Sequence, residues 1–116
     1  MLEISNGIIK FTKGDTVAFE VELKNADGKL YEMQSGDTLT MTVKKSINSG
    51  SPDISVTSTT TKLKILPVST KMLEPGKYCY DVELTTADGN VYTIVGIRKE
   101  NEYNLVVFPE VTINGE

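Results

Sequence analysis

Residues 21–33 read VELKNADGKLYEM, and residues 82–94 read VELTTADGNVYTI. The two segments match at Val, Glu, Leu, Ala, Asp, Gly and Tyr with one constant offset. In each copy an Asp-Gly pair separates two runs of strand-forming residues, which is the strongest local signal for a β-hairpin. The repeat therefore predicts an all-β fold with two similar hairpins, whose turns lie at Asp27-Gly28 and Asp88-Gly89.

Other stretches alternate between apolar and polar residues with a period of two, as half-buried antiparallel strands do. In residues 17–23, for example, Val17 and Phe19 fall on one face while Glu20 and Glu22 fall on the other. The strands expected on this ground cover residues 9–11, 17–23, 39–43, 63–65, 78–84 and 103–108. The Ser- and Thr-rich residues 46–62 fit either a short edge strand at 54–57 or a flexible loop.

The number of strands and the regular spacing of the turn signals predict one domain over residues 1–116. Its expected fold is an immunoglobulin-like antiparallel β-sandwich of about seven to nine short strands, with a small barrel as the alternative. Residues 1–7 and 113–116 are expected to be loose ends. The only helical signal is a short turn over residues 69–74, capped by Ser69 or Thr70.

Residues 73–80 read LEPGKYCY and have the layout of a tyrosine corner. In immunoglobulin-like sandwiches, such a tyrosine donates a hydrogen bond to a backbone carbonyl a few residues upstream and fixes a crossover between the sheets. Here Pro75 and Gly76 form the expected corner and Tyr78 is the expected donor. Cys79 is the only cysteine, so the disulfide of antibody domains is absent.

The order of these motifs resembles that of phage structural domains of the baseplate upper protein N-terminal family. The motifs are KGDT at 13–16, GDTLTMTVK at 36–44, LEPGKYCYDV at 73–82, the two Asp-Gly turns, and PEVT at 109–112. The resemblance implies an immunoglobulin-like building block of a virion or tail, assembled in the cytoplasm of a host bacterium. It implies other virion or tail proteins as partners, and it supplies no catalytic residues.

Composition argues against several classes of function. The chain has no histidine and one cysteine, which removes imidazole-based catalysis and a structural zinc site. The net charge of −4, with dispersed lysines, disfavours nucleic acid. No apolar run reaches transmembrane length, and no secretory signal is visible. We therefore expect no enzyme activity, no cofactor, no metal and no membrane partner.

Two sets of side chains are candidates for contact with a partner. Tyr31 and Tyr92 occupy equivalent positions after the two turns, where they either pack across a hairpin or offer exposed aromatic rings. The carboxylates of strands 17–23 and 78–84 would form an acidic surface if the two hairpins paired, with a weak calcium site as an alternative. The favoured function is a structural protein–protein interaction module that forms homo-oligomers. The alternative is a carbohydrate-binding or cell-surface adhesion domain.

Overall fold

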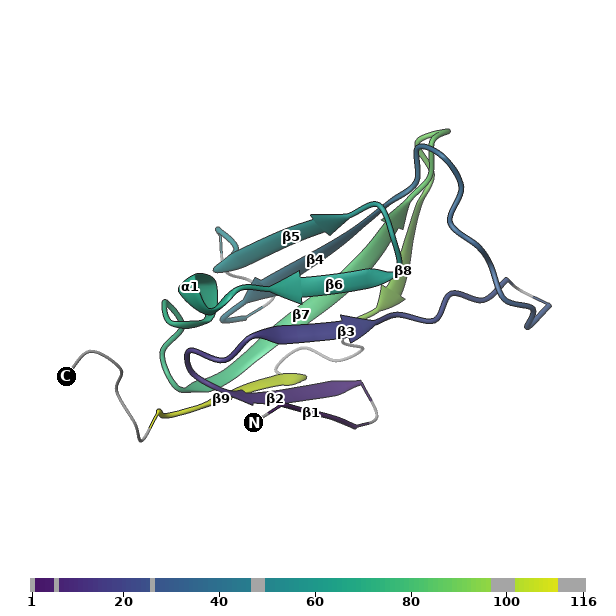
Figure 1. Ribbon diagram of the computed structural model, residues 1–116. Helices are drawn as coiled ribbons and strands as arrows, with labels where there is room; N and C mark the ends of the chain where they lie inside the picture. Colours follow the sequence, from purple (N-terminus) through teal and green to yellow (C-terminus); the bar gives the residue numbers. More distant parts are fainter. Residues whose placement is uncertain (1, 6, 26, 47–49, 97–101, 111–116) are drawn as a thin grey trace.

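The computed structural model describes residues 2–5, 7–25, 27–46, 50–96 and 102–110 (Figure 1). Within them the chain forms nine strands and one short helix. In chain order these are β1 Leu2–Ser5, β2 Ile8–Thr12, β3 Val17–Glu20, β4 Thr38–Lys44, β5 Ile54–Ser58, β6 Lys62–Ile65, α1 Pro67–Thr70, β7 Gly76–Thr85, β8 Val91–Val95 and β9 Leu105–Phe108. The all-β prediction is confirmed.

The strands form a large and a small sheet that pack as a sandwich. The large sheet has the order β1-β2-β9-β7-β4-β5, with β8 also paired to β7, and the small sheet consists of β3 and β6. Figure 1 shows β3 and β6 lying across one face of the large sheet. All described strand pairs are antiparallel except β2 with β9, which is parallel. The all-β sandwich predicted from the sequence is confirmed, with this one parallel pair added.

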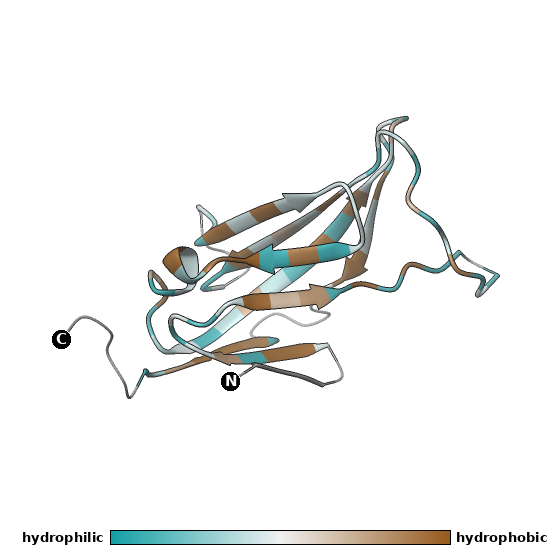
Figure 2. Cartoon of the chain, in the orientation of Figure 1, coloured by the Kyte–Doolittle hydropathy of each residue, from teal (hydrophilic) through white to brown (hydrophobic). Residues whose placement is uncertain are grey.

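The core lies between the two sheets and follows the alternation seen in the sequence. Hydrophilic and hydrophobic residues alternate along β6, as Figure 2 shows, because only every second side chain faces the large sheet. On the facing large sheet, the side chains of β4 and β7 also alternate, so that every second one points into the core. The fully buried residues of the core include Phe11, Val17, Leu39, Met41, Val43, Leu63, Val82 and Leu105.

Strand β7 is the longest strand, and two different strands share one of its edges. Along one edge it pairs with β4 from Cys79 to Thr85. Along the other edge it pairs with β9 from Gly76 to Tyr78, and then with β8 from Val82 to Thr85. Tyr80 lies in the gap between these two partners.

The side-chain amide of Asn104 fills this gap. The backbone N–H of Tyr80 donates to Oδ1 of Asn104 at 2.7 Å, and Nδ2 of Asn104 donates to the carbonyl of Tyr80 at 2.9 Å. Asn104 also uses its backbone, because its N–H donates to Tyr78 and its carbonyl accepts from Ile9. The asparagine, only 6% exposed, therefore acts as a peptide group that continues the ladder where no strand is present.

The hydrogen bond expected of the tyrosine corner is present. The Tyr78 hydroxyl donates to the carbonyl of Glu74 at 2.8 Å, and Pro75 and Gly76 make the corner before β7 begins. The Nζ of Lys45 lies 4.5 Å from the centre of the Tyr78 ring and covers it. Burial raises the pKa of the Tyr78 hydroxyl, so it stays a donor near neutral pH.

Three local expectations need correction or completion. The helix spans Pro67–Thr70 rather than 69–74, and its N-cap is Leu66 without a side-chain cap. The Thr70 hydroxyl instead donates to the carbonyl of Asp15 at 2.7 Å and connects the helix to the start of β3.

Residues 2–5, expected to be loose, form β1 on the edge of the large sheet. Residues 54–58 form the edge strand β5, whereas residues 113–116 lie outside the described residues.

Replacement of Tyr78 by Phe tests the corner. The change removes the bond to Glu74 and retains the ring, so the free energy of unfolding should fall by about 1 kcal/mol. Urea denaturation measures this difference. The control is Tyr103→Phe, at a ring that is 41% exposed, which should change little. Equal stability of both variants would contradict the corner's structural role.

Replacement of Asn104 by Ala tests the amide bridge. It leaves the N–H and the carbonyl of the buried Tyr80 without their partner, so unfolding should become easier by at least about 2 kcal/mol. Urea denaturation again gives the value, and Asn90→Ala in an exposed turn is the matched control. A loss no larger than that of the control would show that the bridge does not stabilise the sheet.

Candidate interaction surface

The connection from β3 to β4, residues 21–37, contains the first copy of the repeat. Figure 1 shows that it extends from the end of β3 away from the sandwich and returns to the start of β4. Its return is held by one bridge between Lys24 and Leu30, and by the N–H of Tyr31, which donates to Leu23. The second copy, in contrast, forms the full hairpin of β7 and β8. The strand expected over 17–23 therefore ends at Glu20.

The two Asp-Gly turns have the same backbone hydrogen bonds despite this difference. In the first, Asn25 donates to Lys29 and Gly28 donates to Asn25; in the second, Thr86 donates to Asn90 and Gly89 donates to Thr86. Gly28 and Gly89 have φ of 85° and 89°. This is a three-residue loop whose glycine lies in the left-handed region. The Asp27 side chain accepts from the N–H of Lys29, and Asp88 is exposed in the equivalent turn.

The carboxylate of Asp37 anchors the β3–β4 connection to the second hairpin. It accepts hydrogen bonds from the Tyr31 hydroxyl, from the N–H of Gln34 at 2.9 Å and from the N–H of Ala87 at 3.3 Å. Asp37 is only 3% exposed. The hydrogen bond from Tyr31, followed by that from Gln34, lowers the pKa of Asp37. One carboxylate therefore joins both copies of the repeat.

Gly36 permits this close approach. A Cβ atom at this position would lie 2.7 Å from the Cβ of Ala87, and φ of Gly36 is 92°. Any other residue would meet both a steric clash and a strained backbone. The contact between the connection and the second turn therefore depends on glycine here.

The structure brings Tyr31 and Tyr92 into one region but gives them different surroundings. Tyr31 is half-buried against the core, and its hydroxyl bonds to Asp37. That bond raises the pKa of Tyr31, with smaller contributions from burial and from the charges of Asp37, Tyr92 and Asp88. Tyr92, on β8, is 53% exposed. Tyr31 thus has a structural role, while Tyr92 presents an open ring.

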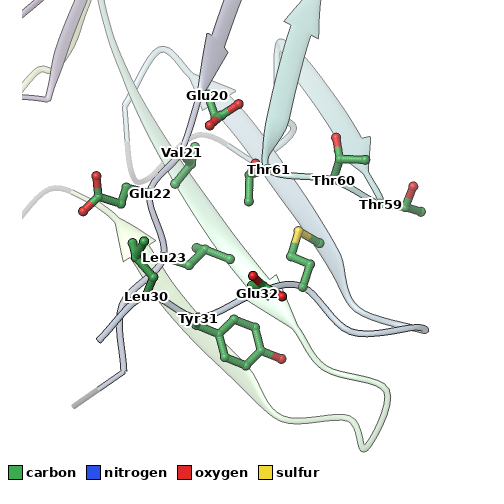
Figure 3. A pocket seen from close by; sticks show the side chains of 11 residues that line it. Glu20, Val21, Glu22, Leu23, Leu30, Tyr31, Glu32, Thr59, Thr60 and Thr61 are labelled. Carbon is green, nitrogen blue, oxygen red and sulfur yellow. The ribbon is translucent and has the colours of Figure 1, made fainter. Parts of the chain in front are cut away.

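An open groove lies beside the β3–β4 connection, at the end of the small sheet. Figure 3 shows Leu23 and Tyr31 on one side of it and Thr60 and Thr61 on the other. The N–H of Val21 donates to the carbonyl of Thr61 at 2.8 Å and closes the groove at one end. Its lining consists of Glu20, Val21, Glu22, Leu23, Leu30, Tyr31, Glu32, Met33, Thr59, Thr60 and Thr61.

The acidic surface expected from paired hairpins is not formed. Glu20 and Glu22 line the groove and are joined there by Glu32. Asp81 and Glu83 alternate with the buried residues of β7, so they lie on the outer face of the large sheet. Burial raises the pKa of Asp81, and the neighbouring Glu83 adds to this effect. The four carboxylates therefore belong to two different faces.

The buried thiol of Cys79 is part of the sandwich rather than of the groove. Its Sγ lies 3.5 Å from the carbonyl of Lys44, and burial raises the pKa of the thiol. The described residues contain no group of three acidic or cysteine side chains arranged to hold a metal ion. No helix in the described part of the chain is long and apolar enough to cross a membrane.

Sequence reasoning identified Tyr31, Glu20 and Glu22 but missed other residues that shape this surface. Asp37 was visible only as part of the motif GDTLTMTVK at 36–44, and Leu30, Glu32 and residues 59–61 carried no signal of their own. Their roles arise from contacts between segments far apart in sequence. No family model, no curated protein and no solved structure gives a significant match to the chain.

Acid should weaken the anchor at Asp37. A carboxyl whose folded pKa is lowered stabilises the fold fully above its unfolded pKa of about 3.9, and this contribution is lost as the pH falls through the folded value. We expect wild type to be more stable than Asp37→Asn near neutral pH, with a difference that shrinks below about pH 4. Urea denaturation across pH measures the difference. A difference independent of pH would contradict the anchor.

Proposed function

We propose that this chain is a non-enzymatic structural module that binds other proteins, as a building block of a phage virion or tail. The observation that carries the interaction role is the exposure of large apolar side chains on β8 and on the β3–β4 connection. Leu30, Val91 and Tyr92 are 67%, 55% and 53% exposed. Large apolar side chains exposed on the surface of a domain are candidates for contact with another protein.

The sequence motifs support the virion part of the proposal. The order of KGDT, the two Asp-Gly turns and LEPGKYCYDV resembles that of the baseplate upper protein N-terminal family. In this role the module would assemble into particles in the cytoplasm of the host bacterium. Its partners would be further copies of itself and other tail proteins. No part of the proposal requires a cofactor or catalysis.

A carbohydrate-binding or adhesion domain is the second candidate. It is favoured by the open ring of Tyr92, which is 53% exposed, since sugars stack on exposed aromatic side chains. The half-buried position of Tyr31 leaves one ring of the pair for this purpose. A glycan array separates the candidates, because saturable binding that is lost in Tyr92→Ala would favour the sugar.

The solution mass tests the interaction proposal. Light scattering after size exclusion, over a series of concentrations, should show a defined oligomer, or a monomer that captures a tail protein from infected or induced cells. Val91→Lys on β8 should reduce the association, since it places a charge within an exposed apolar edge. The matched control is Ala18→Lys, at an exposed position on β3. A monomer at all concentrations that captures no particle protein would contradict the proposal.

A further inference from the structure

The two Asp-Gly turns differ in how the aspartate side chain is held. In the first turn, the N–H of Lys29 donates to Oδ1 of Asp27 at 3.0 Å. In the second turn, the equivalent N–H of Asn90 donates instead to Oγ1 of Thr86 at 3.2 Å. Asp27 is therefore bound to the backbone that follows it, whereas the donor that would hold Asp88 in the same way is already used by the threonine.

We propose that Asp27 is a site of spontaneous isomerisation to isoaspartate. In this reaction the amide nitrogen of Gly28 forms a bond to Cγ of Asp27, and the hydroxyl of the protonated carboxyl leaves with the amide proton as water. The product is a succinimide ring, to which water then adds. Cleavage between the nitrogen and Cγ restores aspartate. Cleavage between the nitrogen and the main-chain carbonyl carbon gives isoaspartate, and the mass of the chain is unchanged.

The hydrogen bond of Asp27 brings the two reacting groups together. It closes a ring that contains Cγ of Asp27 and the amide nitrogen of Gly28, so the side chain is folded back toward that nitrogen. A nucleophile that is held beside its target reacts faster. Gly28 adds to this effect, because it has no side chain to shield the nitrogen and a Cβ atom there would meet nothing within 4 Å.

The first turn is also the easier of the two to open. The glycine N–H must leave its hydrogen bond across the turn before the nitrogen can react. The first turn lies in the β3–β4 connection, away from the sandwich, where the bridge between Lys24 and Leu30 holds it (Figure 1). The second turn joins the paired strands β7 and β8, and the N–H of Ala87 in it donates to Asp37. Local opening costs least where few contacts hold a segment.

Isoaspartate at this position would change the connection and leave the strands of the sandwich in place. The modified residue has one extra carbon in the main chain, so the turn cannot keep both the bond from Asn25 to Lys29 and the bond from Gly28 to Asn25. Leu30, which is 67% exposed, follows this turn directly and would move with it. The reaction needs no partner, so the inference is independent of the proposed function.

Incubation of the complete native chain at neutral pH tests the proposal. Mass spectrometry with electron-transfer fragmentation measures isoaspartate at Asp27 and at Asp88 in the same sample. The same chain unfolded in guanidinium chloride corrects for the flanking residues. We expect the ratio of the rate at Asp27 to the rate at Asp88 to be at least about threefold larger in the native chain than in the unfolded one. The Asn-Gly pairs at 6–7 and 114–115 do not interfere, because deamidation of asparagine raises the mass.

A variant of the second turn tests the role of the side-chain hydrogen bond. Thr86→Val removes the hydroxyl and frees the N–H of Asn90 for Asp88, as in the first turn. The rate at Asp88 should then rise at least about twofold. The matched control is Thr86→Ser, which keeps the hydroxyl and should leave the rate at Asp88 unchanged. The rate at Asp27 should be the same in both variants.

Three outcomes would overturn the proposal. One is the same ratio of the two rates in the native and the unfolded chain, and another is a faster reaction at Asp88 in the native chain. The third is an unchanged rate at Asp88 in Thr86→Val, since the hydrogen bond would then not control the reaction. None of these rates depends on association, so failure of the proposal and failure of the interaction function are separate results.

Discussion

The structure depends on one strand edge that two partners must share. Strand β7 is paired along one side with β4. Along its other side, the pairing with β9 stops at Tyr78 and the pairing with β8 starts only at Val82. An interruption here would leave the buried N–H and carbonyl of Tyr80 without partners, which is costly in a protein core. The Asn104 amide provides both partners and makes the edge continuous. The Tyr80 hydroxyl also donates a hydrogen bond to the carbonyl of Gly7, 2.7 Å away. Burial raises the pKa of this hydroxyl to about 12.

A continuous β7 edge determines where the candidate surface lies. It holds β8 in place, and therefore also the turn that contains Ala87. The N–H of Ala87 in this turn donates a hydrogen bond to Asp37. Asp37 in turn accepts a hydrogen bond from Tyr31 and so holds the returning part of the β3–β4 connection. The groove is formed by that connection and the threonines before β6. Through these contacts, the position of the exposed groove depends on the buried side-chain amide of Asn104.

The sequence predicted most of the fold because strands obey local rules. Alternation identified the inward residues of β4 and β7, and the glycines of the two turns were readable from Asp-Gly alone. The sequence could not predict that the first copy of the repeat would leave the sandwich, or that its return would pass close to Ala87 at Gly36, because these two positions are far apart in the chain. It also could not reveal the role of Asn104, because an asparagine before an apolar run is ordinary at a strand boundary. The sequence also did not identify Glu32 as a residue of the groove, because Glu32 comes near Glu20 only through tertiary structure.

The most direct test of this account is the hydrogen exchange of the Tyr80 amide, measured by NMR in the native state. If the Asn104 side chain continues the ladder, this amide should exchange only through global unfolding, as slowly as the amides at the centre of β4 and β7. The Ala87 amide, which binds Asp37 at the surface, should exchange faster than Tyr80 and more slowly than an exposed turn. Exchange of Tyr80 at the rate of an exposed loop would contradict the account, since the gap between β9 and β8 would then be open.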